Sequence, residues 1–183
     1  RAAVIGGGTM GAGIAVALLE AGLPVVMIER DAEAVARGIS NVRKIFSGSI
    51  KRGRLTETDL EVMLARFTAA TDYTALADAD LVVEAVFEDM AVKRAVFAQL
   101  DASCRPTTIL ATNTSYLDPR DIAEGVSHPE RLIGLHFFSP ANVMKLLEIV
   151  PLTETDARTR ASVFALARRL RKVPVQSGIC EGF

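Results

Sequence analysis

The chain has 183 residues, half of them hydrophobic, so it can bury a substantial core within one domain. Its 21 basic and 22 acidic residues give a formal net charge of -1 at pH 7, which predicts no general attraction to nucleic acid or to anionic membranes. The apolar runs are shorter than the roughly 20 residues of a membrane span, and no signal-peptide pattern opens the chain. These features predict a soluble intracellular protein.

Cys104 and Cys180 have neither the number nor the spacing of a disulfide framework or a metal site. We expect reduced, structurally ordinary thiols and no bound metal.

The first 30 residues predict a strand, a helix and a second strand. A short apolar run is followed by a glycine cluster, an apolar stretch rich in Ala and Leu, a Gly-Leu-Pro stop and another apolar run. Continuous apolar runs, rather than alternation, are typical of strands covered on both faces of a parallel sheet.

Residues 31–66 are charged and helical in pattern. We expect a helical hairpin that projects from the sheet, with a break around "SGS" at 47–49 and "KRGRLTETD" at 51–59. Thr56 and Asp59 have the spacing of a helix cap, which places the start of the second helix there.

The rest of the chain continues to alternate between strand and helix. The predicted strands are 66–71, 80–86, 107–113, 131–138, 144–150 and 173–177, and the predicted helices are 90–104, 117–126 and 154–171. The link between the runs at 131–138 and 144–150 is too short for a helical crossover, so these two strands should form an antiparallel hairpin. The predicted fold is α/β, a Rossmann-like doubly wound and mostly parallel sheet with an inserted helical hairpin and a C-terminal antiparallel strand pair.

The glycine cluster predicts a dinucleotide site. Gly6, Gly8 and Gly11 form G-x-G-x-x-G between the first strand and helix, the context that the motif requires. Glu29 ends the second strand, where an acid accepts hydrogen bonds from the adenosine ribose and disfavours a 2′-phosphate. NAD is therefore predicted over NADP, although Arg30 beside it could serve such a phosphate. The alternative, glycines that only permit packing and a solvated Glu29, remains open.

Residues that follow the later strands are candidates for the chemistry, because ligands of parallel sheets lie beyond the carboxyl ends of the strands. They include 84–88 and "NTS" at 113–115, which either contacts a ligand or forms a turn and helix cap. His136 and Glu148 lie on the two strands of the predicted hairpin, where pairing could bring them together. A carboxylate that orients an imidazole equips it as a base for alcohol oxidation, whereas the alternative is a core histidine bonded to a backbone carbonyl.

Five motifs in order carry a resemblance over essentially the whole chain: "VIGGGTMGAGIA", "DLVVEAVFEDMAVK", "ATNTSYL", "GLHFFSPANVMKLLEIV" and a terminal "GF". Together they resemble the NAD-binding domain of the L-3-hydroxyacyl-CoA dehydrogenase family, most closely that of the multifunctional fatty-acid β-oxidation proteins. The resemblance implies oxidation of L-3-hydroxyacyl-CoA to 3-oxoacyl-CoA with NAD.

The resemblance also implies roles for single residues. His136 would be the general base, Glu148 its partner and Ser115 a hydrogen-bonding group for the substrate oxygen, near the nicotinamide. The expected cofactor-binding residues are Gly6, Gly8, Thr9, Met10, Gly11, Glu29, Glu88, Lys93, Ser115 and Ser139. Without the resemblance, Glu88 and Lys93 are interpreted as an acidic loop followed by a solvated helix.

The resemblance further implies an acyl-CoA partner, a dimeric or multifunctional parent protein, and coenzyme A contacts from the helical hairpin, whose basic residues could equally form a solvated face. We expect residues 1–183 to be one dinucleotide-binding domain of a longer protein, without the helical domain that follows it in the family. Two other hypotheses remain: a dinucleotide-binding module without catalysis of its own, and a related β-hydroxyacid or sugar dehydrogenase, against which the His-Glu pair argues.

Overall fold

The computed structural model describes residues 1–180, so the terminal Gly-Phe motif lies outside the described residues. The strands are β1 (Ala2–Ile5), β2 (Val25–Ile28), β3 (Phe67–Ala70), β4 (Leu81–Glu84), β5 (Ile109–Thr112), β6 (Leu132–Phe137), β7 (Leu146–Pro151) and β8 (Val173–Gln176). The α-helices are α1 (Thr9–Glu20), α2 (Ala32–Lys51), α3 (Glu57–Leu64), α4 (Met90–Ser103), α5 (Pro119–Ala123) and α6 (Ala157–Arg169). Two short 3-10 helices, η1 (Tyr73–Leu76) and η2 (Pro129–Arg131), complete the described elements.

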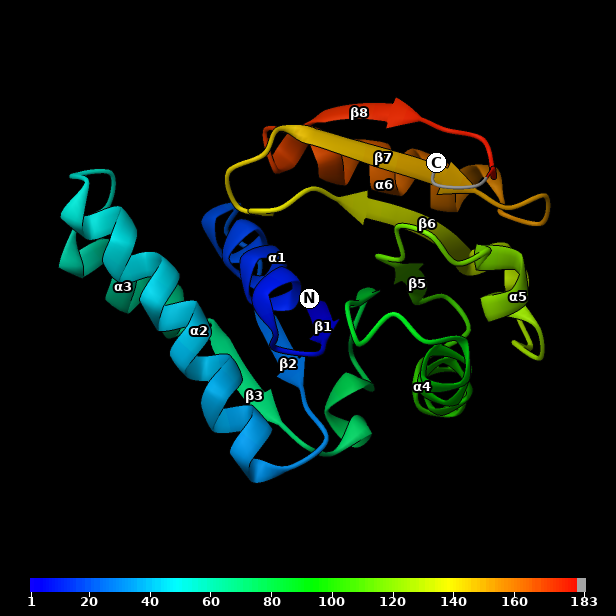
Figure 1. Cartoon of the computed structure of the whole chain (residues 1–183), viewed down its shortest axis with the longest axis horizontal. Coiled ribbons are helices and arrows are strands. Elements are labelled where there is room, and N and C mark those ends of the chain that lie inside the picture. The colour runs from blue at the N-terminus through cyan, green and yellow to red at the C-terminus, as the bar shows by residue number, and fades with distance from the viewer. Residues whose placement is uncertain (181–183) are drawn as a thin grey trace.

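The strands form one sheet in the order β3-β2-β1-β4-β5-β6-β7-β8 (Figure 1). Neighbours from β3 to β6 are parallel, β6 and β7 are antiparallel, and β8 is parallel to β7. The chain reverses its direction across the sheet after β3, and the next strand, β4, pairs with β1. This is a Rossmann-like α/β sheet with an antiparallel pair near the C-terminus, and the predicted fold class is confirmed.

Each face of the sheet has its own apolar core. One core joins α1, α2 and α6 to strand residues such as Val4 and Met27, and the other joins α4, α5 and η1 to residues such as Ile5 and Val82. Successive residues of a strand point to opposite faces, so a sheet covered on both sides requires apolar residues at every position. In each of β1, β2 and β4 all four residues are buried, which explains the continuous apolar runs of the sequence.

The helical hairpin of α2 and α3 extends beyond the edge of the sheet (Figure 1), but the break between its two helices covers only part of the expected region. The "SGS" segment at 47–49 continues α2, which is helical from Ala32 to Lys51. Val42, Phe46 and Ser49 are buried along one side of the helix, and this packing offsets the low helix propensity of the serines and the glycine. The break lies within the "KRGRLTETD" segment, and α3 begins with the predicted Thr56–Asp59 capping box.

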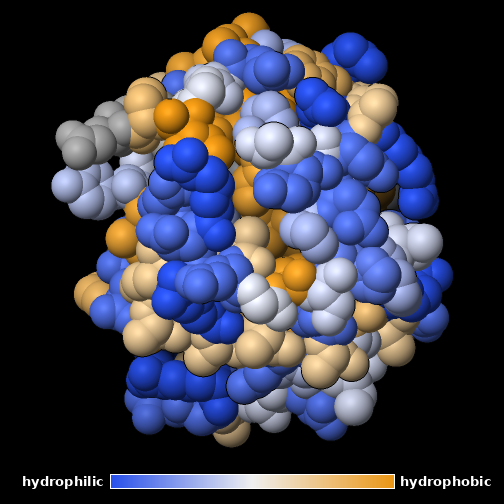
Figure 2. All heavy atoms as spheres, turned by 90° about the vertical axis from the view of Figure 1, so that its right-hand side faces the viewer, coloured by the Kyte–Doolittle hydropathy of each residue, from blue (hydrophilic) through white to orange (hydrophobic). Residues whose placement is uncertain are grey.

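Hydrophilic side chains cover much of the face shown in Figure 2, where hydrophobic atoms form separate patches between them. Among the described helices, none combines the length and the apolar composition that crossing a membrane requires.

Candidate active site

A pocket of about 1060 Å³ opens at the carboxyl ends of the parallel strands. Its walls come from the segments that follow β1, β2, β4, β5 and β6, far apart in the sequence. A doubly wound sheet brings these strand ends to one edge, and the crevice between them is where such sheets bind ligands.

The glycine cluster forms the turn from β1 into α1. Gly6 has a φ of +94°, a conformation that L side chains rarely adopt. A Cβ on Gly11 would lie 1.8 Å from the Gly6 carbonyl oxygen, so only glycine allows helix and turn to pack this closely. A Cβ on Gly8, by contrast, would meet no protein atom within 4 Å, and Gly8 lines the pocket.

The N-terminus of α1 fits an anionic group. Gly8 is the N-cap and contributes no side chain that could occupy the first amide groups, and the first turn holds no acidic residue. Those amides and the helix dipole present partial positive charge to the pocket. The open space at Gly8 lets a phosphate approach the backbone, so the residues present fit the pyrophosphate of a dinucleotide.

Glu29 ends β2 and lines the same pocket. Its Oε1 accepts a hydrogen bond from the Gly7 amide at 2.6 Å, and its Oε2 accepts one from the Arg30 amide at 3.2 Å. The Arg30 side chain is 79% exposed and contacts Asp31 rather than Glu29, with Nε 3.1 Å from Oδ2 of Asp31. The carboxylate is thus held beside the glycine turn.

His136 and Glu148 are direct partners in the β6–β7 register. Nδ1 of His136 lies 2.8 Å from Oε2 of Glu148, and the two side chains are only 13% and 16% exposed. The imidazole lines the pocket, whereas Glu148 lies outside the lining. This geometry matches the contact expected from the predicted hairpin.

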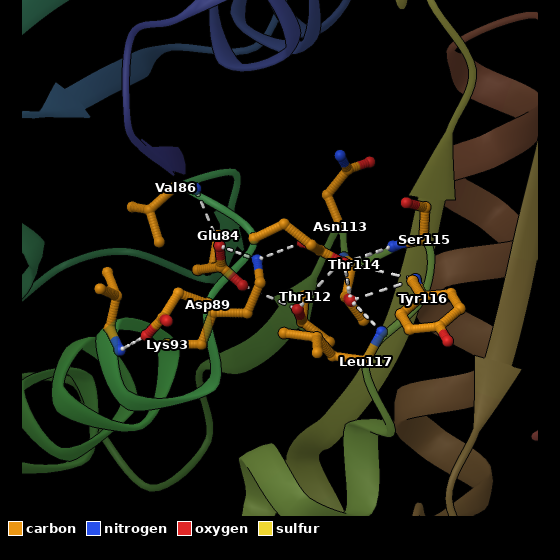
Figure 3. Close-up of polar contacts among 12 residues, drawn as sticks. Glu84, Val86, Asp89, Lys93, Thr112, Asn113, Thr114, Ser115, Tyr116 and Leu117 are labelled. Carbon is orange, nitrogen blue, oxygen red and sulfur yellow. Dashed lines mark hydrogen bonds and ion pairs between the residues drawn. The ribbon is translucent and has the colours of Figure 1, made fainter. Parts of the chain in front are cut away.

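Lys93 is not on a solvated helix face, contrary to the local interpretation of the sequence. Its side chain is 1% exposed, and its ammonium group lies 2.7 Å from Oε1 of Glu84 and 3.2 Å from Oε2 of Glu88. Glu84 is fully buried at the end of β4 and also accepts a hydrogen bond from the Thr112 hydroxyl at 2.7 Å. Figure 3 shows Glu84, Lys93 and Thr112 meeting between β4, α4 and β5.

The segment that follows β5 is organised by Glu88. Its Oε1 accepts hydrogen bonds from the amides of Ser115 and Tyr116 at 3.0 and 3.3 Å, and from the Thr114 hydroxyl. Burial raises the pKa of Glu88, but the Thr114 hydrogen bond and the Lys93 charge outweigh it and hold this pKa below its usual range. The carboxylate is therefore ionised at neutral pH.

The "NTS" segment forms a turn, whereas the cap of the following helix, α5, is Asp118. Thr114 accepts a hydrogen bond from the Leu117 amide at 3.0 Å, as expected of a turn. Asn113 accepts one from the Phe137 amide at 2.8 Å and so ties this segment to β6. Asn113 and Ser115 also line the pocket.

Most of the predicted site residues share this pocket. Those that line it are Gly6, Gly8, Thr9, Met10, Glu29, Glu88, Lys93, Ser115, His136 and Ser139. Gly11 lies beneath the turn and Glu148 behind His136. The sequence placed Glu84 only within the candidate segment 84–88, although a charged residue that ends an apolar strand is a signal of buried pairing. Sequence reasoning missed Tyr73, which lines the pocket from η1, an element that the sequence did not predict.

The fold and the site define the chain as a dinucleotide-binding domain of a dehydrogenase type. A family model described as "3-hydroxyacyl-CoA dehydrogenase, NAD binding domain" matches residues 1–180. The chain belongs to this family, and the expected resemblance is confirmed.

Individual relatives agree with the family. The peroxisomal fatty acid beta-oxidation multifunctional protein AIM1 of Arabidopsis thaliana is 41% identical over 183 residues, which is 100% of this chain and 25% of that protein. The 3-hydroxyadipyl-CoA dehydrogenase of Escherichia coli is 44% identical over 181 residues, 99% of this chain and 38% of that protein. The crystal structure of 3-hydroxybutyryl-CoA dehydrogenase from Escherichia coli superposes with a TM-score of 0.95 at 43% identity, over 100% of this chain and 39% of that one. The chain thus spans about a quarter of the length of the multifunctional relative.

Proposed function

We propose that the chain takes part in the NAD-dependent oxidation of L-3-hydroxyacyl-CoA to 3-oxoacyl-CoA in fatty-acid β-oxidation. The balanced reaction is L-3-hydroxyacyl-CoA + NAD+ giving 3-oxoacyl-CoA + NADH + H+. The observation that supports this most directly is the His136–Glu148 contact of 2.8 Å on the wall of the pocket that also contains the glycine turn.

His136 is the general base of the proposal. Its imidazole accepts the proton of the substrate hydroxyl, and Glu148 holds the ring through Nδ1 and stabilises the positive charge that develops on it. Ser115 hydrogen-bonds the substrate oxygen from the opposite segment. Bound NAD supplies the hydride acceptor.

The dinucleotide lies along the glycine turn in this proposal. The amides at the start of α1, including those of Thr9 and Met10, hold the pyrophosphate, and Glu29 accepts hydrogen bonds from the adenosine ribose. Glu88, Lys93, Ser115 and Ser139 line the same pocket and would contact the cofactor there.

The wider setting follows from the relatives. An acyl-CoA thioester is the proposed substrate, and a dimeric or multifunctional protein is the proposed context. The multifunctional relative from Arabidopsis thaliana is named as peroxisomal. For this chain we propose the cytoplasm if it is bacterial, and the peroxisome or the mitochondrial matrix if it is eukaryotic.

Replacing His136 tests the reaction. In the full chain, His136→Gln should lower kcat for a 3-hydroxyacyl-CoA by about two to four orders of magnitude and leave the dissociation constant of NAD nearly unchanged. His128→Gln is the matched control, because His128 also contacts a glutamate, Glu130, at 3.1 Å but lies on the surface outside the pocket. Turnover retained by His136→Gln would refute the assignment.

A dinucleotide-binding module without catalysis of its own is the second candidate, because the chain spans only 25% of the multifunctional relative. An assay of the purified chain with NAD and a 3-hydroxyacyl-CoA separates the two. Formation of NADH supports the dehydrogenase, whereas NAD binding without NADH formation supports the module.

A further inference from the structure

A carboxylate and an ammonium group are buried together beneath the pocket. Glu84 is 0% exposed and Lys93 is 1% exposed, and Nζ lies 2.7 Å from Oε1. A buried ion pair is a weak source of stability, because the cost of desolvating both charges offsets their attraction and apolar residues often serve as well. Stability alone therefore does not explain why the apolar strand β4 ends in this pair.

The Glu84 carboxylate is fixed from three directions. Its Oε1 accepts hydrogen bonds from the Lys93 ammonium and, at 2.8 Å, from the Val86 amide, while its Oε2 accepts the Thr112 hydroxyl at 2.7 Å. These partners come from α4, from the segment after β4 and from β5 (Figure 3). Glu84 is thus a rigid anchor for the Lys93 side chain.

Lys93 transmits this anchoring to the pocket. Its ammonium group also contacts Glu88, at 3.2 Å, and the Glu88 side chain is 35% exposed and lines the pocket. Oε1 of Glu88 in turn accepts the amides of Ser115 and Tyr116 at 3.0 and 3.3 Å. A continuous series of charged contacts therefore runs from the buried end of β4 to the backbone that carries Ser115.

Neither partner of Lys93 is replaceable by the other. Glu84 holds the ammonium group from below with a buried, fully bonded carboxylate, whereas Glu88 is partly exposed and contacts it from the pocket side. With Glu84 uncharged, the buried Lys93 ammonium would keep only the partly exposed Glu88 as a charged partner, and removing one partner of a buried pair is strongly destabilising.

We propose that Glu84 is a positioning residue: acting through Lys93, it fixes the Glu88 carboxylate and thereby the Ser115 and Tyr116 amides at the pocket wall. Glu84 does not line the pocket and acts without touching a ligand. The consequence for cofactor binding rests on the proposed function, which assigns Glu88, Lys93 and Ser115 to the dinucleotide.

The test is Glu84→Gln in the full chain, which keeps the shape of the side chain and removes its charge. Amide hydrogen exchange measured by NMR should become about tenfold faster at Ser115 and Tyr116, and the dissociation constant of NAD measured by calorimetry should rise about tenfold. Asp101→Asn is the matched control. It breaks another largely buried ion pair, with Arg131 at 2.6 Å, whose partners lie outside the pocket lining.

Both variants should lose thermal stability, but only Glu84→Gln should change the NAD affinity and the exchange rates of the Ser115 and Tyr116 amides. The proposal would be overturned if Glu84→Gln showed the amide exchange and NAD affinity of the wild type. It would also be overturned if Asp101→Asn changed both quantities as much as Glu84→Gln does. If Glu84→Gln does not fold, Glu84→Asp is the second variant, because its shorter side chain keeps the charge but withdraws it from Lys93. Glu84→Asp should show smaller increases in amide exchange and in the NAD dissociation constant. Their absence would overturn the proposal.

Faster amide exchange with unchanged NAD affinity would overturn the link to the cofactor. No readout here depends on turnover. Failure of this inference is therefore distinguishable from failure of the proposed reaction, which the kcat of His136→Gln decides.

Discussion

Glu29 places a fixed negative charge at the end of the pocket that the glycine turn forms. The Gly7 amide, 2.6 Å from Oε1, keeps the carboxylate at this position. Arg30, the residue that could have served a 2′-phosphate, directs its guanidinium at Asp31 instead. The structure thus supports the preference for NAD over NADP that the sequence indicates.

Replacing Glu29 should weaken this preference. We expect Glu29→Ser to bind NAD more weakly and NADP more tightly, so that the ratio of the two dissociation constants changes by about tenfold or more, because like charges no longer oppose a 2′-phosphate. Calorimetric titration with both cofactors measures it. Glu124→Ser is the control, since Glu124 pairs with Arg94 at 2.6 Å and neither residue lines the pocket. An unchanged ratio in Glu29→Ser would show that another group selects the cofactor.

Sequence position was enough to place some site residues and not others. Glu29 and His136 could be located because each has a defined position on a strand whose direction follows from the apolar runs. Lys93 could not, because its burial depends on how α4 packs beside β4 and β5, and a lysine next to Arg94 carries no local sign of burial. Only the tertiary structure brings Glu84, Glu88 and Lys93 together.

At the scale of elements, short links and continuous apolar runs were the features of the sequence that best predicted the strands and their pairing. The link between residues 138 and 144 excluded a crossover, and β6 and β7 are antiparallel as predicted. The expected break at 47–49 failed because Phe46 and Ser49 pack into the structure, a tertiary contribution that local propensity does not contain. The 3-10 helix η1 was not predicted, because its four residues are too few to show a periodic pattern.

Substitutions at two glycines of the turn into α1 should have different effects, one on stability and the other on NAD affinity. Gly11→Ala places a methyl group 1.8 Å from the Gly6 carbonyl oxygen and should lower the free energy of unfolding by about 2–3 kcal/mol. Gly8→Ala meets no protein atom, so its stability should stay within about 1 kcal/mol of wild type. Its NAD affinity should nevertheless fall about tenfold, because the methyl group occupies the space through which a phosphate approaches the backbone.

Urea unfolding and calorimetry with NAD measure both effects of the glycine variants. A Gly8→Ala variant that binds NAD normally would contradict the placement of the pyrophosphate at this turn.

At the scale of the whole molecule, acid should destabilise the fold through carboxylates that are hydrogen-bonded and ion-paired in the folded state. Burial raises the pKa of Asp101, but hydrogen bonds from Ser127 and the charge of Arg131 outweigh it, and the net pKa is lowered, as it is for Glu88. A carboxylate whose pKa is lower in the folded state stabilises the fold above its unfolded pKa, and this contribution is lost as the pH falls through the folded pKa.

The urea midpoint should therefore be nearly constant above about pH 5 and fall steadily below about pH 4. Equilibrium unfolding followed by circular dichroism across this range measures it. Asp101→Asn should show a shallower decline, because one of the responsible carboxyl groups is gone. A midpoint that rises on acidification would contradict the ionised state assigned to these groups.

The most direct test of the proposed chemistry is kcat for a 3-hydroxyacyl-CoA in four forms: wild type, His136→Gln, Glu148→Gln and the double variant. Because Glu148 acts through the imidazole, the double variant should lose about as much turnover as His136→Gln alone. Losses that multiply would contradict the account, since they would mean that the two side chains act independently despite their 2.8 Å contact.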